Sequence, residues 1–369
     1  MEAAAVIAVL RDFTDRVLGR GEAAITVPPF DGALKPNQLL EGAAVVAQLD
    51  APDDLATNGR SVFVSDGPRL LHLDGSALNE VQRFDRTITA LTCLPDGGFA
   101  VAFQGREICI QGGKHDGTRW SDAAGKPFCA VNALSPAPNG KLLATDGSAT
   151  QPYDKWSHDL MGLGRTGRIL ELDCSTGAAR EVAAGLSYAF GACSAGEEIW
   201  VCESWRHRLL RCGAGRSGAV LDRLPGYPSR ITAAAGGGFW LSVFAARTQL
   251  VEFVLRETAF RKRMMAEIEP EYWIAPTLSS GRTFLEPMQG AHIKTMGILK
   301  PWAPPRSYGL VIRLSPEGLP RYSFHSRVDG KNHGVVAAVE CGGNLFVLAK
   351  GSRRLLRLDI ADAERRLLA

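Results

Sequence analysis

The residues of this sequence that can do chemistry are isolated carboxylates and histidines set among apolar runs. Glu203 lies in WVCESW, with apolar residues on both sides. A buried carboxylate is rarely left unpaired, so Glu203 either pairs with Arg206 or Arg208 or is held for a reaction. His333, in GKNHGVV, is either a general base that works near neutral pH or a histidine of a surface turn.

Aromatic and titratable side chains also gather in one segment, SATQPYDKWSHDLMGLGRT (148–166), which carries Tyr153, Trp156 and His158. The motifs of several common enzyme classes are absent from the chain. It has no GxSxG elbow, HExxH helix, Walker loop or dinucleotide fingerprint in a suitable strand–helix context. Those classes are thereby excluded, and the chemistry has to be sought through the elements that position these side chains.

The composition is typical of a globular protein rich in turns. Hydrophobic residues make up 46% of the chain and charged residues 22%, which is too small a charged fraction for a disordered protein. The 40 glycines and 20 prolines supply the turns that many short strands need. The net charge of +3 is spread along the sequence, without a basic stripe interleaved with aromatic residues, so we expect no nucleic-acid partner.

The eight cysteines form no CxxC pair and have no metal-ligand spacing. Several of them, such as Cys109 in EICI and Cys202 in WVCES, lie inside apolar runs. We therefore expect small buried thiols of a reducing compartment rather than disulfides.

The N-terminal segment, MEAAAVIAVLRDFTDRVLGRG, has no basic start before its apolar stretch, and charges interrupt that stretch from Arg11 onward. This pattern is neither a signal peptide nor a membrane span. Apolar residues fall close to helical spacing, which predicts a short amphipathic helix in residues 1–24. We expect this helix to pack on the domain, with a membrane-surface or partner role as the alternative, and we expect a cytoplasmic protein without a transmembrane segment.

One pattern recurs six times: a short apolar strand, a turn, a second apolar strand, another turn and a third strand. The copies span residues 53–74, 88–110, 131–173, 191–212, 229–255 and 335–359. A single small sheet cannot bury both faces, so the copies must pack on one another, and radial packing meets that need. The sequence therefore predicts an all-β, six-bladed β-propeller as a single domain over residues 25–369. A pair of β-sandwiches, the alternative, does not explain the repeat.

Two insertions interrupt the repeat. Residues 148–166 lengthen the third copy between its second and third strands, and residues 256–307 separate the fifth copy from the sixth. The longer insertion begins with RETAFRKRMMAEIEPEYWI, which is typical of a helix, and its proline-rich end is irregular. Loops of this length in a compact domain are usually functional or disordered, and the aromatic content here favours an ordered cap.

Two acids fall at the same position of the repeat, Asp66 in VSDG and Asp146 in ATDG. Recurrence of an acid across copies predicts a turn role, in which the carboxylate binds backbone N–H groups. This interpretation makes both residues structural.

Four stretches carry a likeness to a known family. The first stretch is VNALSPAPNGKLLATDGSATQPYDKW, followed by GRTGRILELDCSTGAAREVAAGLSYAFGACSAGEEIWVCESWRHRLLR. It resembles the middle of strictosidine synthase-like proteins. The next blade of that family resembles LPGYPSRITAAAGGGFWLSV, and its closing blade resembles RSYGLVIRLSPEG followed by VECGGNLFVLAKGSRRLLRLD. The lead-in of the adipocyte plasma membrane-associated type resembles PPFDGALKPNQLLEGA. The likeness implies a six-bladed propeller and leaves the reaction open, because a fold does not fix chemistry.

The wider superfamily that this resemblance points to includes calcium-dependent lactonases, arylesterases and phosphotriesterases. Its lactonase-type site uses an acidic residue in the first blade, which Asp53 or Asp54 matches, and an asparagine in the third, which Asn132 matches. Where the family has a further asparagine and an Asp-Asn pair, this chain has Phe190 and Ser229-Arg230.

These two departures argue against calcium. Calcium takes about six to eight oxygen ligands, and neither a phenyl ring nor a guanidinium supplies one. Arg230 would also repel the ion. An ion, if one were bound, would be held by Asp53 and Asn132, and we assign no cofactor.

The amine-condensing synthases of the family use a glutamate as acid and base in the approach to the last blade. This chain has Val336 at that position. Valine has no proton to transfer, which argues against strictosidine synthase activity in the strict sense. The nearest polar groups are Lys331, Asn332 and His333.

The leading hypothesis is therefore a hydrolase that acts on a small lactone or ester in the propeller channel. Asp53, Asn132 and His333 would position water or polarise the carbonyl, and Arg230 would stabilise the oxyanion in place of the missing ion. The resemblance places the 148–166 loop near the mouth of the channel. We expect this loop and the inner strands to contact the small-molecule substrate through Tyr153, Trp156, His158, Phe190, Glu203 and Ser229.

Two alternatives stay open at this point. The first is a metal-independent, synthase-like enzyme that condenses an amine with an aldehyde through a base other than the usual glutamate. The second is a non-catalytic propeller that binds a ligand or a protein partner, which the several lost functional positions favour.

Overall fold

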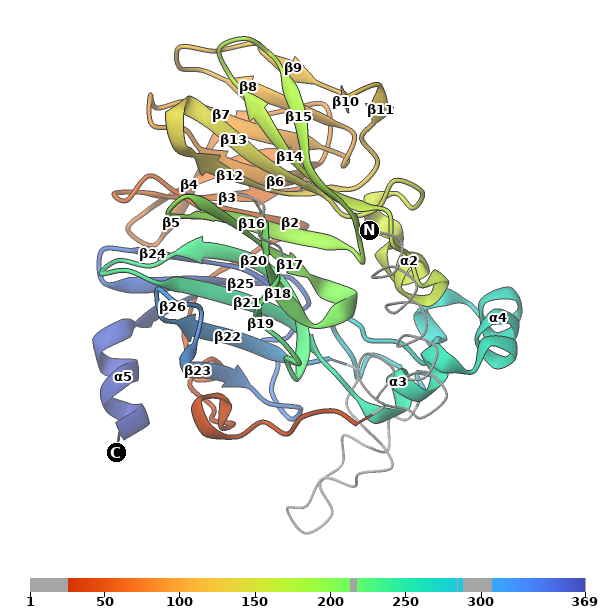
Figure 1. The fold of residues 1–369 in the computed structure, drawn as a ribbon. Helices are drawn as coiled ribbons and strands as arrows, with labels where there is room; N and C mark the ends of the chain where they lie inside the picture. The colour runs from red at the N-terminus through yellow and green to blue at the C-terminus, as the bar shows by residue number, and fades with distance from the viewer. Residues whose placement is uncertain (1–25, 213–217, 284, 288–306, 369) are drawn as a thin grey trace.

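A computed structural model describes residues 26–212, 218–283, 285–287 and 307–368 of the chain. Its strands form six four-stranded antiparallel sheets arranged in a ring (Figure 1). The predicted all-β, six-bladed propeller is therefore confirmed. The helix predicted in residues 1–24 lies outside the described residues.

The first three sheets follow one another along the chain. The first contains β2 (Pro52–Thr57), β3 (Val62–Asp66), β4 (Arg69–Asp74) and β5 (Ala77–Arg83). The second contains β6 (Ile88–Cys93), β7 (Phe99–Phe103), β8 (Glu107–Gln111) and β9 (Arg119–Trp120). A small hairpin of β10 (Asp122–Ala123) and β11 (Lys126–Pro127) leads to the third, which contains β12 (Val131–Ala137), β13 (Lys141–Asp146), β14 (Gly167–Asp173) and β15 (Ala179–Leu186).

The remaining sheets complete the ring. The fourth contains β16 (Ala189–Ala195), β17 (Glu198–Glu203), β18 (Arg208–Cys212) and β19 (Gly218–Leu221). The fifth contains β20 (Gly226–Ala233), β21 (Phe239–Ala246), β22 (Gly309–Leu314) and β23 (Pro320–Ser326). The sixth contains β24 (Val335–Cys341), β25 (Asn344–Ala349) and β26 (Arg354–Asp359), and its outer strand is β1 (Ala44–Gln48).

Strand β1 closes the ring, because it comes before the first sheet in sequence and pairs antiparallel with β26 of the last. The inner strands pack side by side in chain order, and β24 packs against β2. Both ends of the propeller chain are therefore needed for one sheet, and this pairing closes the ring. The helix α5 (Ile360–Leu368) follows β26.

Each inner strand carries a bulge at the same level. The pairing register shifts between Pro52 and Leu55, Ile88 and Ala90, Val131 and Ala133, Ala189 and Ala192, Pro228 and Ile231, and Val335 and Ala337. A bulge leaves a residue out of the ladder and re-aims its side chain. The residues at these bulges are Asp53, Asp54, Thr89, Asn132, Phe190, Gly191, Ser229, Arg230 and Val336. The six strands thus bring residues of very different chemistry to one level of the ring.

Apolar side chains fill the spaces between neighbouring sheets. Six buried clusters lie in the described chain, and each contains residues of two adjacent sheets. The cluster between the sixth and first sheets also contains Phe190 and Val336, and it continues into the insertions through Leu160, Val254 and Trp273. The insertions are therefore packed onto the propeller rather than loosely attached.

The long insertion lies inside the fifth sheet, between β21 and β22, and not between the fifth and sixth sheets as the sequence predicted. Residues 249–255 were expected to form a third strand but belong to helix α3 (Gln249–Arg256). Thr248 caps this helix by accepting a hydrogen bond from the Val251 N–H, and Val251 and Val254 are buried on one face. The stretch around 307–318 therefore belongs to the fifth sheet rather than to the closing one.

The insertions form a cap on one end of the ring. The shorter one, between β13 and β14, contains α2 (Trp156–Gly162), and the longer one contains α3 and α4 (Thr258–Glu267). These three helices lie together on the right of Figure 1, whereas α5 lies on the opposite side. The predicted helical start of the long insertion is confirmed by α4.

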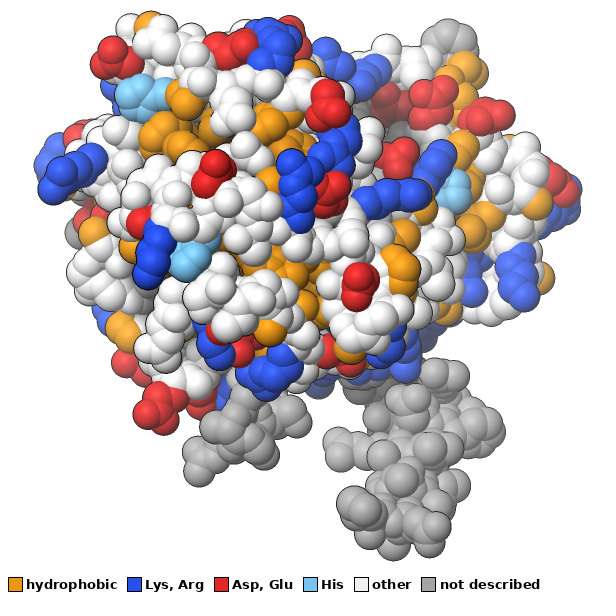
Figure 2. All heavy atoms as spheres, turned by 90° about the horizontal axis from the view of Figure 1, so that it is seen from above, with side chains coloured by type: hydrophobic (Ala, Val, Ile, Leu, Met, Phe, Trp, Pro, Cys, Tyr) orange, Lys and Arg blue, Asp and Glu red, His pale blue; other side chains and the backbone are white. Residues whose placement is uncertain are grey.

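The eight cysteines are free thiols, as predicted, and six of them are buried. On the face that Figure 2 shows, cationic and anionic side chains are interspersed. Among the helices that the structure describes, none has the length and apolar character needed to cross a membrane.

Candidate functional site

The axis of the propeller is occupied by the guanidinium of Arg230, which is 5% exposed. Its Nη1 donates to the carbonyl oxygen of Asp53 at 2.7 Å. Its Nη2 donates to the carbonyl oxygens of Thr89 at 2.9 Å and Asn132 at 2.5 Å, and to Asp53 Oδ1 at 3.1 Å. Arg230 extends from β20 of the fifth sheet, so it reaches β2, β6 and β12 of the first three sheets.

Asp54 and Phe190 complete the surroundings of this guanidinium. Asp54 Oδ1 lies 3.1 Å from Arg230 Nε, and Asp54 Oδ2 accepts the Leu91 N–H at 2.9 Å. The guanidinium carbon lies 5.2 Å from the centre of the Phe190 ring, which is a cation–π contact. Burial raises the pKa of Asp54 to about 7, against the opposing charge of Arg230. Arg230 is therefore the group that favours a charged Asp54 in this buried place.

At the cap end of the axis, Lys350 and Tyr153 converge on the carboxylate of Asp53. Lys350 Nζ donates to Asp53 Oδ2 at 2.6 Å and to the Tyr153 hydroxyl at 3.0 Å. The Tyr153 hydroxyl in turn donates to Asp53 Oδ1. The side chain of Lys350 is 25% exposed, whereas that of Asp53 is 6% exposed. These three residues are the axial group that meets solvent, and we call them the mouth triad.

The mouth triad joins three separate parts of the chain. Asp53 comes from β2, Lys350 follows the end of β25, and Tyr153 lies in the short insertion. Gly105, with a φ of +69°, lets Tyr153 approach, because a Cβ there would lie 2.9 Å from the Tyr153 Cβ. Burial and the neighbouring Asp53 carboxylate raise the pKa of Tyr153 well above its ordinary value, so its hydroxyl stays protonated.

Asn132 lies at the axis, but its side chain forms hydrogen bonds within the third sheet and to the fourth. Its Nδ2 donates to the Ala189 carbonyl oxygen at 2.9 Å, and its Oδ1 accepts from Thr145 Oγ1 at 2.6 Å. Ser229, which was expected to contact substrate, donates to the Val335 carbonyl oxygen at 3.3 Å and is fully buried. Both side chains therefore bridge neighbouring sheets, and Asn132 faces Arg230 through its backbone.

The predicted aromatic residues gather beneath the cap. Trp156 lies edge-to-face with Phe244 at 5.5 Å between ring centres, and Phe190 lies edge-to-face with Tyr188 at 6.0 Å. His158 contacts Trp273 of the long insertion, with ring centres 4.7 Å apart. Trp156 and Phe190 thus pack into the cluster that continues into the insertions, whereas Tyr153 belongs to the mouth triad.

His333 is buried at the junction of the fifth and sixth sheets. Its Nδ1 lies 2.8 Å from Ser307 Oγ, and its Nε2 lies 2.8 Å from the Arg327 carbonyl oxygen. A carbonyl oxygen only accepts, so Nε2 carries the proton and Nδ1 faces the hydroxyl. The ring also stacks on Tyr308. This placement supports neither the surface-turn interpretation nor a general base at the axis.

The acids that end the second strands have one structural role in three sheets. Each accepts an N–H from a residue one or two positions before its inner strand and pairs with an arginine at the first or second position of the third strand. The sets are Asp66 with Ala51 and Arg69, Asp146 with Ala130 and Arg168, and Glu203 with Ser187 and Arg208. The turn role predicted for Asp66 and Asp146 is confirmed. Glu203, expected at the substrate, belongs to the same structural set and forms the ion pair that was its alternative.

The axial residues do not fit a calcium ion. The oxygens that would face an ion at this level, from Asp53, Thr89 and Asn132, accept hydrogen bonds from Arg230. Phe190 offers a ring where a ligand would have to stand, and among the described residues no cluster of three or more histidine, cysteine or acidic side chains is placed to hold a metal. A guanidinium and a calcium ion cannot share these oxygens.

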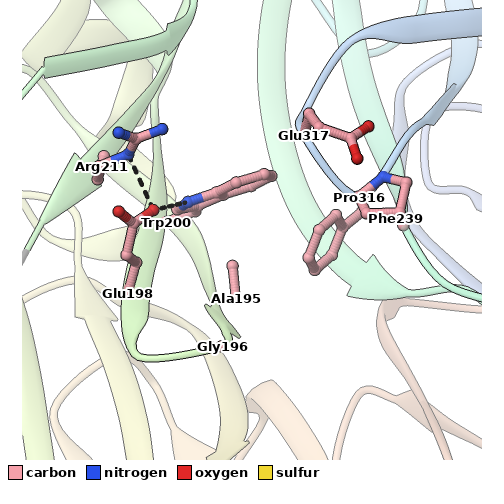
Figure 3. A pocket seen from close by; sticks show the side chains of 9 residues that line it. Ala195, Gly196, Glu198, Trp200, Arg211, Phe239, Pro316 and Glu317 are labelled. Atoms are coloured by element: carbon pink, nitrogen blue, oxygen red, sulfur yellow. Dashed lines mark hydrogen bonds and ion pairs between the residues drawn. The ribbon is translucent and has the colours of Figure 1, made fainter.

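A cavity of about 420 Å³ lies elsewhere, between the fourth and fifth sheets. Figure 3 shows the rings of Trp200 and Phe239 on its walls, with Glu198 paired to Arg211 at 2.8 Å on one side. The turns that line it, such as that around Pro316, are at the end of the ring opposite the cap. The predicted site residues do not line this cavity.

The sequence is similar to those of several known proteins. No family model matches the chain. The adipocyte plasma membrane-associated protein of Salmo salar is 26% identical over 250 residues, which are 64% of this chain and 53% of the relative. Strictosidine synthase-like protein 6 of Arabidopsis thaliana is 26% identical over 167 residues, which are 44% of this chain and 45% of the relative. The chain is similar in sequence to the strictosidine synthase-like proteins. The predicted resemblance is thereby confirmed. The chain spans about half the length of these two curated proteins.

Solved structures similar to this chain are also propellers. A gluconolactonase from Xanthomonas campestris matches with a TM-score of 0.55 at 12% identity, over 85% of this chain and 88% of the other. A luciferin-regenerating enzyme matches with a TM-score of 0.50 at 12% identity, over 87% of this chain and 93% of the other. At such identity the likeness shows the fold alone.

Sequence reasoning missed two members of the axial site, Lys350 and Thr89. A lysine after an apolar strand gives no signal by its type, and Thr89 contributes through its backbone carbonyl. The position of Lys350 within the repeat could have identified it. Lys350 follows a second strand, as does the short insertion that carries Tyr153, so both belong to the same end of the ring.

Proposed function

We propose that this propeller hydrolyses a small lactone or ester at the mouth triad of Asp53, Tyr153 and Lys350, without a metal ion. The observation that carries the proposal is the convergence of an ammonium and a phenol on one carboxylate where the axis meets solvent. Hydrolysis of an acyl bond needs a group that takes a proton from water and donors that stabilise the oxyanion. The triad holds both kinds of group within hydrogen-bonding distance.

The roles follow from the charges of the three groups. Asp53 accepts a proton from the attacking water and returns it to the leaving alkoxide oxygen after the acyl C–O bond breaks. Lys350 donates a hydrogen bond to the carbonyl oxygen as it gains negative charge, and Tyr153 turns its O–H from Asp53 to the same oxygen once Asp53 has taken up the proton. The raised pKa of Tyr153 suits a donor rather than a base. The net change is addition of water across the acyl bond, so atoms and charges balance.

Arg230 holds Asp53 in place and does not contact the substrate in this proposal. Four hydrogen bonds to protein oxygens occupy its guanidinium, which leaves it unsuited to bind the oxyanion that the sequence hypothesis assigned to it. Its hydrogen bonds to the backbone and carboxylate of Asp53 fix that residue beneath the mouth. Arg230 is therefore a positioning residue in this proposal.

The propeller fold is compatible with an acyl substrate. The matched structures include a gluconolactonase on the same propeller fold. A condensing synthase receives less support, because Val336 is buried in an apolar cluster at the position of its usual glutamate. Among these two enzyme classes the triad favours hydrolysis.

A panel of lactones and aryl esters tests the proposal. Lys350→Met removes one oxyanion donor and is expected to lower kcat/KM by about a hundredfold. The matched control is Lys141→Met, because Lys141 also pairs with a carboxylate, Glu171, at 2.8 Å but lies on the third sheet. Equal turnover by both variants, with both folded, would remove the mouth triad from the reaction.

A non-catalytic propeller is the second candidate. It is favoured by the fact that hydrogen bonds between sheets already use the side chains of Asn132 and Ser229 at the axis. In that case no compound of the panel is hydrolysed. One of the compounds binds at the mouth instead, and Lys350→Met abolishes this binding. Turnover that depends on Lys350 excludes this candidate.

A further inference from the structure

We propose that Arg230 is an internal cation that permanently fills a calcium-type cage of oxygen atoms, and that removing its side chain converts the axis into a divalent-cation site. The cage consists of the carbonyl oxygens of Asp53, Thr89 and Asn132 and the carboxylates of Asp53 and Asp54. The inference concerns the axis and does not depend on the proposed hydrolase activity.

The oxygen atoms around the guanidinium are of the kind that calcium binds. The three carbonyl oxygens lie 2.5–2.9 Å from Arg230 nitrogens. One oxygen of each carboxylate, Asp53 Oδ1 and Asp54 Oδ1, lies 3.1 Å away. Carboxylate and backbone carbonyl oxygens are typical calcium ligands, and water supplies the remainder of the about six to eight that the ion takes.

The charge at the axis demands a cation. The two carboxylates, Asp53 and Asp54, are 4% and 2% exposed. Arg230 and Lys350 balance them. Without the guanidinium the Asp54 carboxyl has to bind a proton or another cation, because an uncompensated buried negative charge is costly in a low-dielectric interior. A small cation that enters from solvent restores the balance, whereas a neutral side chain does not.

The cage should keep its shape when the side chain is shortened. Gly191, with a φ of +98°, brings the backbone of β16 directly against β20, since a Cβ there would lie 2.7 Å from the Arg230 Cα. Asp54 is held by the N–H groups of Leu91 and Leu55 at 2.9 and 2.8 Å. The positions of the strand and of this carboxylate therefore do not depend on the guanidinium.

The natural protein gives the first arm of the test. Its cage is filled, so its melting temperature is expected to be the same in 1 mM CaCl₂ as in EDTA, to within about 1 °C. For Arg230→Ala we expect calcium to bind in isothermal titration and to raise the melting temperature by about 5 °C over the value in EDTA.

Two variants serve as controls. Arg168→Ala removes another buried arginine, which pairs with the Asp146 carboxylate and donates to the carbonyl oxygens of Lys126 and Pro127. We expect this variant not to respond to calcium, because a single carboxylate remains at its site. Arg230→Lys keeps a positive charge in the cage, so we expect it to ignore calcium as well.

The outcomes decide the proposal. A calcium response confined to Arg230→Ala supports it, and so does soluble Arg230→Ala protein that is recovered only when calcium is present. The proposal is overturned by a response of the natural protein, by folded Arg230→Ala that binds no calcium, or by an alanine variant that is insoluble with and without calcium.

Discussion

Arg230 Nη1 donates a 2.7 Å hydrogen bond to the carbonyl oxygen of Asp53, and this contact joins two sheets that are not neighbours in the ring. The same guanidinium reaches Thr89 and Asn132, so the fifth sheet is tied to the first, second and third. Adjacent sheets are already held by their apolar clusters. Arg230 adds polar links between sheets that are not neighbours, as Tyr153 does at the cap end through Asp53 and Lys350.

Replacement of Arg230 by methionine is expected to destabilise the fold strongly. The change leaves Asp54 buried without its partner and leaves three carbonyl oxygens without a donor. Breaking one side of a buried pair costs about 3–5 kcal/mol. Urea unfolding of the natural protein and of Arg230→Met measures the loss.

The control for that loss is Arg83→Met. Arg83 pairs with Glu80 on the surface, where the two side chains are 58% and 37% exposed. Exposed pairs contribute about 0–1 kcal/mol, so this variant should unfold close to the natural protein. Similar losses in the two variants would mean that the axial position of Arg230 has no special weight.

Asn132→Ala tests whether the third-sheet asparagine is structural. The variant leaves the Ala189 carbonyl and the Thr145 hydroxyl without their partners, which is expected to cost about 2–3 kcal/mol of stability. Because the amide faces these groups, we expect kcat on any substrate found to change little. Unaltered stability combined with a large fall in kcat would instead place the amide in the reaction.

Tyr153→Phe tests the donor assigned to the cap. Loss of the hydroxyl removes one hydrogen bond to Asp53 and one oxyanion donor, and we expect kcat to fall by about tenfold or more with a smaller change in KM. Tyr322→Phe is the matched control, because its hydroxyl also donates to a carboxylate, Glu364, on the outside of the ring. Equal effects of the two changes on kcat would argue against a role for Tyr153.

Glu252 predicts a dependence of stability on pH. Burial raises its pKa, but hydrogen bonds and charge from His207 and Arg247 outweigh burial and lower it from 4.5 to about 2. A carboxylate with a lowered folded pKa stabilises the protein above pH 4.5, and this contribution is lost as the pH falls toward 2. Burial lowers the pKa of His207, so Arg247 supplies the charge at neutral pH, and the contribution there is below the about 3 kcal/mol that the whole shift would give.

Unfolding of the natural protein and Glu252→Gln at pH 7 and pH 3 measures this contribution. We expect the glutamine variant to be less stable at pH 7 and the difference to shrink at pH 3, where part of the carboxylate is protonated. The Glu252 carboxylate accepts from the His207 and Arg247 side chains, which joins helix α3 to the propeller. An equal difference at both values would show that the carboxylate does not hold the cap through its charge.

The sheets were predictable because their signals are local. Turn residues such as Gly342 and Gly343 separate apolar strands of matching length in each copy of the repeat. The fifth sheet was assigned incorrectly because its third strand follows a long insertion, and helix α3 took the place of that strand in the linear pattern. Nothing in the local pattern tells a reader that β22 returns to the same sheet.

The axial site was predictable only in part. Asp53 and Arg230 were identified through the family resemblance and Tyr153 through the types of residue in its segment, but their partners were not. Lys350 pairs with a carboxylate 297 residues away in sequence. The carbonyl oxygens that hold Arg230 belong to the backbone, which carries no residue-specific signal. Asn132 kept its family position but turned its amide to a neighbouring sheet.

The most direct test of the account is a crystal structure grown in 10 mM CaCl₂. We expect planar density of the Arg230 guanidinium within hydrogen-bonding distance of the carbonyl oxygens of Asp53, Thr89 and Asn132, with Lys350 and Tyr153 on the Asp53 carboxylate. A spherical density peak with oxygen ligands at about 2.3–2.6 Å, and Arg230 turned away from it, would contradict a propeller whose axial cation is its own side chain.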